Sequence, residues 1–171
     1  MLMPITISTT GFHVKPWERL RDELSDMRTP LTAVSERLLF GISKQFETEG
    51  AYGANRWTAL SPKYAEWKLK HGGSNKILAG LARAGDVGQR PQTYTVSGKM
   101  RKELLSPSDV KISPKHMVYI APSEIASYHQ KGTDNMPERP IVPIGFMVKL
   151  GKETDLIFRD WIDAIITKSG L

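Results

Sequence analysis

The chain has 171 residues, of which 40% are hydrophobic, and a formal net charge of +6 at pH 7, so we expect one domain of ordinary size with its own apolar core. It contains no cysteine, which excludes disulfides and thiolate metal sites. It has no apolar run near the length of a membrane span and no secretory signal at its start, so we expect a protein kept in a reducing cytoplasm or in a particle assembled there.

Three elements are predicted before residue 50. Residues 5–8 alternate apolar and polar side chains, which is typical of a short strand, and residues 12–14 are expected to extend it. A helix opens at Pro16, with its apolar side chains at helical spacing: Trp17, Leu20, Leu24 and Met27. A second helix is expected from Thr29 as cap and Pro30 in the first turn. Its stripe predicts the longest helix of the chain: Leu31, Val34, Leu38, Ile42 and Phe46.

The next segment, residues 56–68, crowds two tryptophans, a tyrosine and three cations together. Thr58 or Ser61 is expected to cap a helix that has Pro62 near its first position. Arginine and aromatic side chains together are typical of contact surfaces, although tryptophans are as often core residues. The residues that we assign to subunit or partner contact here are Arg56, Trp57, Tyr64, Trp67 and Lys68.

The positive charge is concentrated in the middle third of the chain. Residues 51–115 carry twelve Lys and Arg against four Asp and Glu, whereas the two flanking thirds are each slightly acidic. Such a block attracts phosphates or an acidic protein surface, and the plainer alternative is a solvated basic loop. Residues 71–95 contain breakers and little periodicity, so we expect a long, flexible loop excursion.

A short basic helix is predicted over residues 97–105, with three candidates for facing DNA or a partner: Lys99, Arg101 and Lys102. Residues 109–121 alternate as a β-hairpin. A further short helix starts near Pro122 and ends at Gly132, before a rigid proline-containing loop at 136–140.

The apolar residues 141–150, broken by Pro143 and Gly145, predict a strand or a pair of strands. The last element is a helix with Glu153 and Asp155 in its first turn and Lys168 in its last, as its dipole favours. Its buried stripe is expected to be Ile157, Trp161, Ala164 and Ile165. The order of elements predicts an α+β fold, in which a small, mainly antiparallel sheet packs against a long helix.

Catalytic patterns are missing from the sequence. None of the four histidines, His13, His71, His116 and His129, has another histidine at the i, i+4 spacing of a helical zinc pair. The acidic residues of the loops show no paired acid and base, and the glycine clusters lack the context of a phosphate-binding loop. We therefore expect no enzyme, no metal and no cofactor. The opposite hypothesis is a hydrolase or metalloenzyme that uses His116, His129 and Asp134.

Three segments together resemble the phage virion morphogenesis family. The first is Arg56 to Lys68, with its tryptophan–leucine–serine–proline block, which follows a long helix and its turn at residues 46–50. The second is Ile125 to Gly132, with histidine and glutamine before the glycine. The third is Met136 to Pro140, similar to the family's arginine–proline loop. Their order and rough spacing also agree.

The resemblance implies a structural protein of the head–tail neck, a tail-completion or tail-terminator protein. Such proteins form a ring, commonly of six copies, which caps the tail tube and meets the connector. The protein would be assembled in the cytoplasm of a host bacterium and would contact passing DNA at most passively, with no membrane partner. The main alternative is a basic nucleic-acid-binding module of a mobile element, which should bind duplex DNA with a steep salt dependence.

Most motif residues are then expected to serve folding and subunit contact. Trp57, Leu60 and Trp67 would anchor their segment against the long helix. Arg139 would hydrogen-bond carbonyls or a carboxylate across a subunit boundary, since its fork suits such acceptors. His129 and Gln130 would position the turn at Gly132. The residues assigned to structural roles are Leu60, Ser61, Pro62, His129, Gln130, Gly132 and Pro140.

Overall fold

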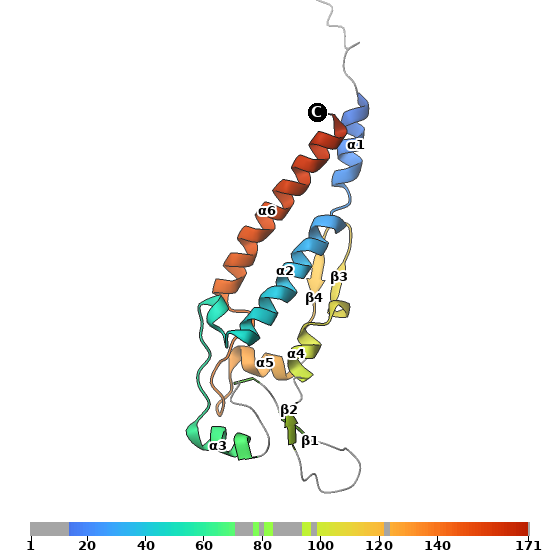
Figure 1. The fold of residues 1–171 in the computed structure, drawn as a ribbon. Coiled ribbons are helices and arrows are strands. Elements are labelled where there is room, and N and C mark those ends of the chain that lie inside the picture. The colour runs from blue at the N-terminus through green and yellow to red at the C-terminus, as the bar shows by residue number, and fades with distance from the viewer. Residues whose placement is uncertain are drawn as a thin grey trace, which may run out of the picture.

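The computed structural model describes residues 14–70, 77–78, 81–83, 94–96, 99–121 and 124–170. It is an α+β fold, as predicted, and most of its described elements are helices (Figure 1). The helices are α1 (Val14–Leu24), α2 (Arg28–Glu47), α3 (Pro62–Lys70), α4 (Lys99–Leu104), α5 (Glu124–Lys131) and α6 (Ile144–Ser169), with 3-10 turns η1 (Ala51–Gly53) and η2 (Pro107–Asp109). The strands are β1 (Leu81–Arg83), β2 (Tyr94–Val96), β3 (Val110–Ile112) and β4 (Met117–Tyr119).

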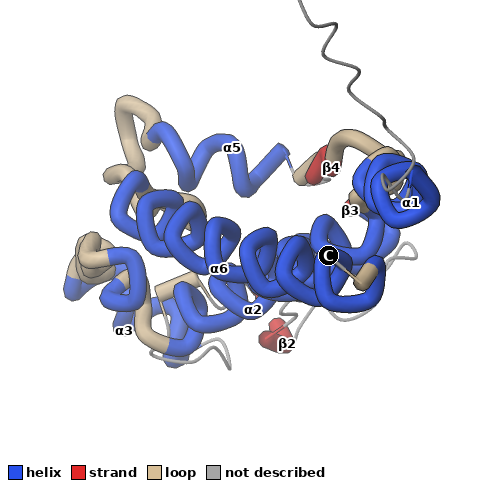
Figure 2. Tube along the Cα trace, turned by 90° about the horizontal axis from the view of Figure 1, so that it is seen from above, coloured by secondary structure: helices blue, strands red, loops and turns tan. Residues whose placement is uncertain are grey.

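The two long helices α2 and α6 lie side by side and run in opposite directions (Figures 1 and 2). The α2 side chains that enter the core are those of the predicted stripe from Val34 to Phe46. α6 contributes Phe146, Leu150 and Ile165. α1 packs on the far half of α6, and the β3–β4 hairpin and α4 pack on α2. The core therefore follows the seam between α2 and α6.

Two glycines let these elements approach one another closely. A Cβ atom on Gly41 of α2 would lie 2.0 Å from Cε2 of Phe146, whose side chain is fully buried in α6. A Cβ atom on Gly145 would lie 2.4 Å from the carbonyl oxygen of Gly53 in η1. Real Cβ atoms do not come so close to other atoms, so only glycine allows this packing.

The start of α2 differs from the prediction. The helix begins at Arg28, before Thr29, and the Oδ1 atom of Asp26 accepts the backbone N–H of Arg28 at 3.1 Å. The same carboxylate accepts hydrogen bonds from the guanidinium of Arg28. The hydrogen bonds from Arg28 lower the pKa of Asp26 to about 2. The N-cap position is Met27, whose side chain makes no capping bond, and the Asp26 carboxylate one residue earlier reaches the first free N–H group of the helix instead.

The segment 141–150 is not a strand: α6 begins at Ile144 and has 26 residues against 20 in α2, so it is the longest helix among the described residues. Short apolar runs do not distinguish a strand from a buried helix, and Pro143 and Gly145 interrupted the helical pattern. Glu153 and Asp155 consequently lie near the middle of the helix. Of the predicted buried stripe, Ala164 is exposed and Ile165 is buried.

In the described part of the chain, the strands form two short antiparallel pairs. β3 pairs with β4, which confirms the hairpin predicted over residues 109–121. The hydroxyl of Tyr119 donates to the carbonyl of Leu104 at 2.9 Å, which ties the hairpin to α4, and burial raises the pKa of Tyr119 to about 12. β1 pairs with β2 inside the segment predicted as a loop. Of the rest of that loop, the structure describes Ile77 and Leu78, and Leu78 is buried in the core. The other loop residues and the strand predicted at 5–8 lie outside the described residues.

Candidate functional site

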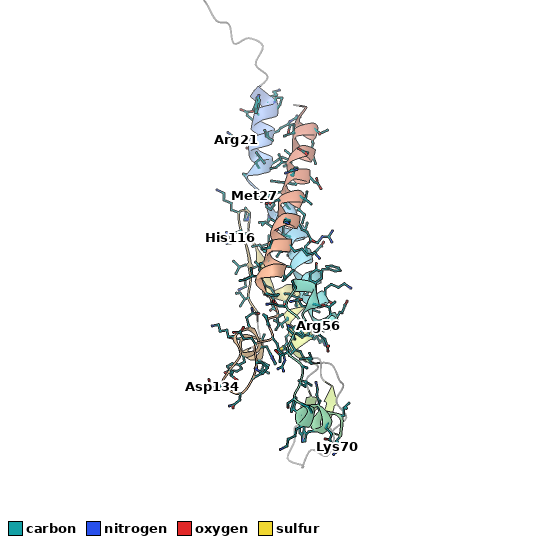
Figure 3. The ribbon with its side chains drawn as sticks, turned by 90° about the vertical axis from the view of Figure 1, so that its left-hand side faces the viewer. Arg21, Met27, Arg56, Lys70, His116 and Asp134 are labelled. Carbon is teal, nitrogen blue, oxygen red and sulfur yellow. The ribbon has the colours of Figure 1, made fainter. Side chains whose placement is uncertain are left out.

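The three segments that carry the resemblance meet at one end of the molecule. Figure 3 shows Arg56, Asp134 and Lys70 toward this end, whereas Arg21 lies at the other. Four side chains and the backbone groups that they contact form what we call the motif cluster. Its side chains are Trp57, Lys68, Gln130 and Arg139.

Trp57 attaches the first segment to the core. Its indole is 4% exposed and meets the ring of Phe46 edge-on, with centroids 5.6 Å apart. Its Nε1 donates to the carbonyl of Pro140 at 2.8 Å, and its backbone N–H donates to the backbone carbonyl of Glu49 at 2.8 Å. A buried indole needs such a partner for its polar atom. The expected anchoring by Trp57 is confirmed, and Trp57 is therefore not on the exposed contact surface.

Arg139 joins the third segment to the first. Its Nε donates to the carbonyl of Thr58 at 3.0 Å and its Nη2 donates to the carbonyl of Ala59 at 3.5 Å. Its backbone N–H donates to the backbone carbonyl of His129 at 2.8 Å. Carbonyl acceptors were predicted, but both belong to the same chain and the side chain is buried. Burial lowers the pKa of Arg139, and the nearby Tyr64 opposes that shift.

Gln130 joins the second segment to the start of α6. Its Oε1 accepts the backbone N–H groups of Ile141 and Val142, both at 3.0 Å, and its Nε2 donates to the carbonyl of Val142 at 3.1 Å. Gln130 thus positions residues 141–142. The prediction that it positions the turn after α5 is wrong. That turn rests on Gly132, whose φ of +71° suits glycine.

Lys68 belongs to the interior of the motif cluster, although it was assigned to partner contact. The residue is 2% exposed. Burial lowers the pKa of Lys68, the charge of Arg139 lowers it further, and the carboxylate of Glu49 opposes both. Its long side chain therefore fills space within the chain and does not offer a free cation to a partner.

The outer face of α3 remains available for contact. The helix starts as predicted, with Pro62 first and the carbonyl of Ser61 accepting the N–H of Ala65 at 2.9 Å. The rings of Tyr64 and Trp67 stack with centroids 5.7 Å apart and planes at 19°. Trp67 is 40% exposed, so the prediction that it anchors the segment is wrong, while its assignment to contact stays a prediction.

Two basic residues of the middle third are paired with acidic side chains of the same chain. Arg101 donates to Ser43 at 3.0 Å and pairs with Glu47 at 3.3 Å. Lys70 pairs with Glu66 at 2.7 Å. Lys102 is exposed, and the side chain of Lys99 lies outside the described residues. Arg56 is exposed beside the motif cluster, so it stays a candidate for contact.

The structure does not bring together His116, His129 and Asp134, the residues of the hydrolase or metalloenzyme hypothesis. Figure 3 shows His116 and Asp134 well apart along the molecule. In the described part of the chain, no three metal-ligating side chains gather, and no helix has the length and apolar character needed to cross a membrane. The Nδ1 atom of His129 is buried with no hydrogen-bond partner among the described residues, and the charge of Arg139 in the motif cluster acts on the ring.

This environment predicts a pH dependence of stability. Burial, with a smaller effect of Arg139, lowers the pKa of His129 below its ordinary 6.5. The unfolded chain therefore takes up this proton at a higher pH than the folded chain, so stability present above 6.5 is lost as the pH falls toward the folded pKa. We expect urea unfolding from about pH 7 to about pH 5 to show a smaller loss in His129→Gln than in the wild type.

The matched control is His116→Gln, because His116 is exposed on the hairpin turn. Its loss of stability over the same pH range should follow the wild type. An unchanged pH dependence in His129→Gln would contradict the coupling of this histidine to the motif cluster.

Two residues at and just after the end of α2 were not predicted from the sequence. Gln45 is fully buried, and its Oε1 accepts the N–H of Gly53 at 2.8 Å. Glu49 has a positive φ of 51°, and its carboxylate accepts the N–H of Ile77 at 3.0 Å. The only signal for Gln45 was its place three residues after Ile42, on the buried face of α2.

No family model, curated protein or solved structure matches this chain. The resemblance described above is therefore carried by the three segments themselves.

Proposed function

We propose that this chain is a structural protein of a bacteriophage virion, a tail-completion or tail-terminator protein of the head–tail neck. It assembles in the cytoplasm of a host bacterium into a ring, commonly of six copies. The ring caps the tail tube and joins it to the connector below the head. The chain carries out no reaction and holds no cofactor.

The observation that supports this proposal is the convergence of the three resembling segments. Trp57 and Pro140 are 83 positions apart, yet the indole of one donates to the carbonyl of the other. Arg139 reaches back over a similar distance to Thr58. Residues shared with a structural family would be expected to hold the fold together, and these residues do so through buried hydrogen bonds.

The exposed apolar surface supports assembly with other chains. Large hydrophobic side chains are exposed on several elements, among them Tyr64, Trp67 and Leu69 of α3, Ile125 and Tyr128 of α5, and Ile144 and Val148 of α6. Scattered exposed apolar residues are normal, but groups of them along one element mark contact sites. A ring subunit needs two different contact faces, because the same contact repeats head to tail around the ring.

The test is assembly on the tail tube. Purified protein mixed with tail tubes of the same phage should appear by electron microscopy as a ring at one tube end, and light scattering should detect oligomers at high concentration. A protein that never binds the tube, or complete virions without this polypeptide, would overturn the proposal. Binding of the isolated protein to duplex DNA with a steep salt dependence would instead support the nucleic-acid-binding alternative.

A further inference from the structure

α6 carries a second, mainly apolar stripe, which flanks the side that faces the core. Its positions follow one another at alternating spacings of four and three residues, which is the heptad pattern of a coiled coil. We call it the outer stripe of α6: Ile144, Val148, Gly151, Asp155, Phe158 and Ile162. Ile144 is 83% exposed and Val148 is 56% exposed. The side chains that α6 buries in the core, such as Phe146 and Leu150, lie outside this stripe.

The outer stripe lies at an edge of the molecule. Figure 1 shows α6 running along one side, with α2 and α1 on its inner flank. A Cβ atom on Gly151 would meet no atom within 4 Å, so the middle of the stripe is open space. A helix with apolar stripes on two sides normally has neighbours on both.

We propose that a second copy of this chain packs its α6 antiparallel along the outer stripe, about a twofold axis near Glu153. The positions of the stripe are symmetric about residue 153, so their spacing is the same in either direction along the helix. Ile144 of each copy then faces Ile162 of the other, Val148 faces Phe158, and the open position at Gly151 faces Asp155. Each large side chain meets an apolar one, and the only polar position meets the smallest residue.

The charged side chains in and beside the outer stripe favour a second copy of the chain over other binding partners. In this register, Asp155 of each copy lies beside Lys152 of the other, so two opposite-charge pairs form. Both side chains are exposed, and neither makes an ion pair with the described residues of its own chain. A nucleic acid or an anionic membrane would require positive charge throughout, and Asp155 opposes that requirement.

This contact goes beyond the proposed neck function and does not depend on it. A twofold contact uses the same face of both copies and joins them in pairs, whereas ring closure requires contact between two different faces. The two proposals can therefore fail separately.

The absence of cysteine from the sequence allows a direct test by disulfide cross-linking. We expect an equimolar mixture of Ile144→Cys and Ile162→Cys proteins to give a covalent dimer under mild oxidation. Neither variant alone should do so, because the two copies of either position lie roughly 27 Å apart along the antiparallel helices, from 18 residues at 1.5 Å each. A disulfide needs Cα atoms within about 7 Å.

The control is a mixture of Ile125→Cys and Ile162→Cys, since Ile125 is also exposed but lies on α5. It should give no dimer. All substituted side chains are exposed, so the variants should fold. No cross-link in the first mixture, or an equally efficient cross-link with Ile144→Cys alone, would overturn the antiparallel contact.

Charge reversal gives a second readout that does not depend on cysteine. Asp155→Lys alone and Lys152→Asp alone should each weaken the dimer roughly tenfold by analytical ultracentrifugation, because each change sets like charges beside one another twice. The double variant restores both pairs and should restore the dimer. A double variant as weak as the single ones would overturn the assigned register, whatever the protein does at a tail.

Discussion

Replacement of Trp57 by alanine is expected to lower the free energy of unfolding by about 3–5 kcal/mol. The change removes a buried ring from its contact with Phe46 and leaves the carbonyl of Pro140 without the indole N–H. The loss is large because the substitution leaves a cavity between α2 and the loop before α6. Both of these segments are held in place by the core, so they cannot move in to fill the cavity. Urea unfolding followed by circular dichroism measures it.

Two further variants separate the causes. Trp57→Phe keeps an aromatic ring but removes the N–H donor, so it should cost less than Trp57→Ala. Trp67→Ala provides the matched control, because Trp67 is the exposed tryptophan of the same segment. It should change stability little. A cost at Trp67 as large as that at Trp57 would contradict the placement of the two tryptophans.

The second large effect is expected from a pair of glycine-to-alanine changes. Alanine favours a helix interior over glycine by about 1 kcal/mol, so a helical glycine in open space should gain stability on substitution. Gly151→Ala meets that condition. Gly41→Ala gains the same propensity, but its methyl group would overlap Phe146. We expect a net loss of about 1–3 kcal/mol for Gly41→Ala, since overpacking forces neighbouring side chains and backbone to move.

The comparison is best made by urea unfolding at two protein concentrations, because association through α6 would add to the apparent stability. Phe146→Leu, combined with Gly41→Ala, should recover part of the loss by making room for the methyl group. A stabilising Gly41→Ala would show that α2 and α6 are not as close as the structure places them.

Local pattern was enough to predict much of the fold. The buried stripe of α2, the start of α3 at Pro62 and the β3–β4 hairpin each depend on residues close in sequence, and each was predicted correctly. The start of α6 was not, because the reason for Gly145 is the carbonyl of Gly53, far away in the sequence. A glycine that serves close packing cannot be distinguished by pattern from one that ends a helix.

The same limit applies to the candidate site. The sequence predicted that Arg139 would bind carbonyl oxygens or a carboxylate across a subunit boundary, because the fork of its guanidinium suits such acceptors. It could not predict that these carbonyls belong to Thr58 and Ala59 of the same chain. Lys68 shows the opposite case, since a lysine beside a tryptophan in a basic segment is usually solvated, and only tertiary structure reveals its burial.

The length of α6 has a consequence for how one copy can connect two neighbours. At 1.5 Å per residue its 26 residues extend roughly 39 Å, and α1 lies near one end of the helix while the motif cluster and α3 lie beyond the other (Figure 1). A neighbour bound at α3 would therefore leave the α1 end free for another. A single polypeptide can thus bridge two components that never touch each other, with a continuous helix fixing the gap between them.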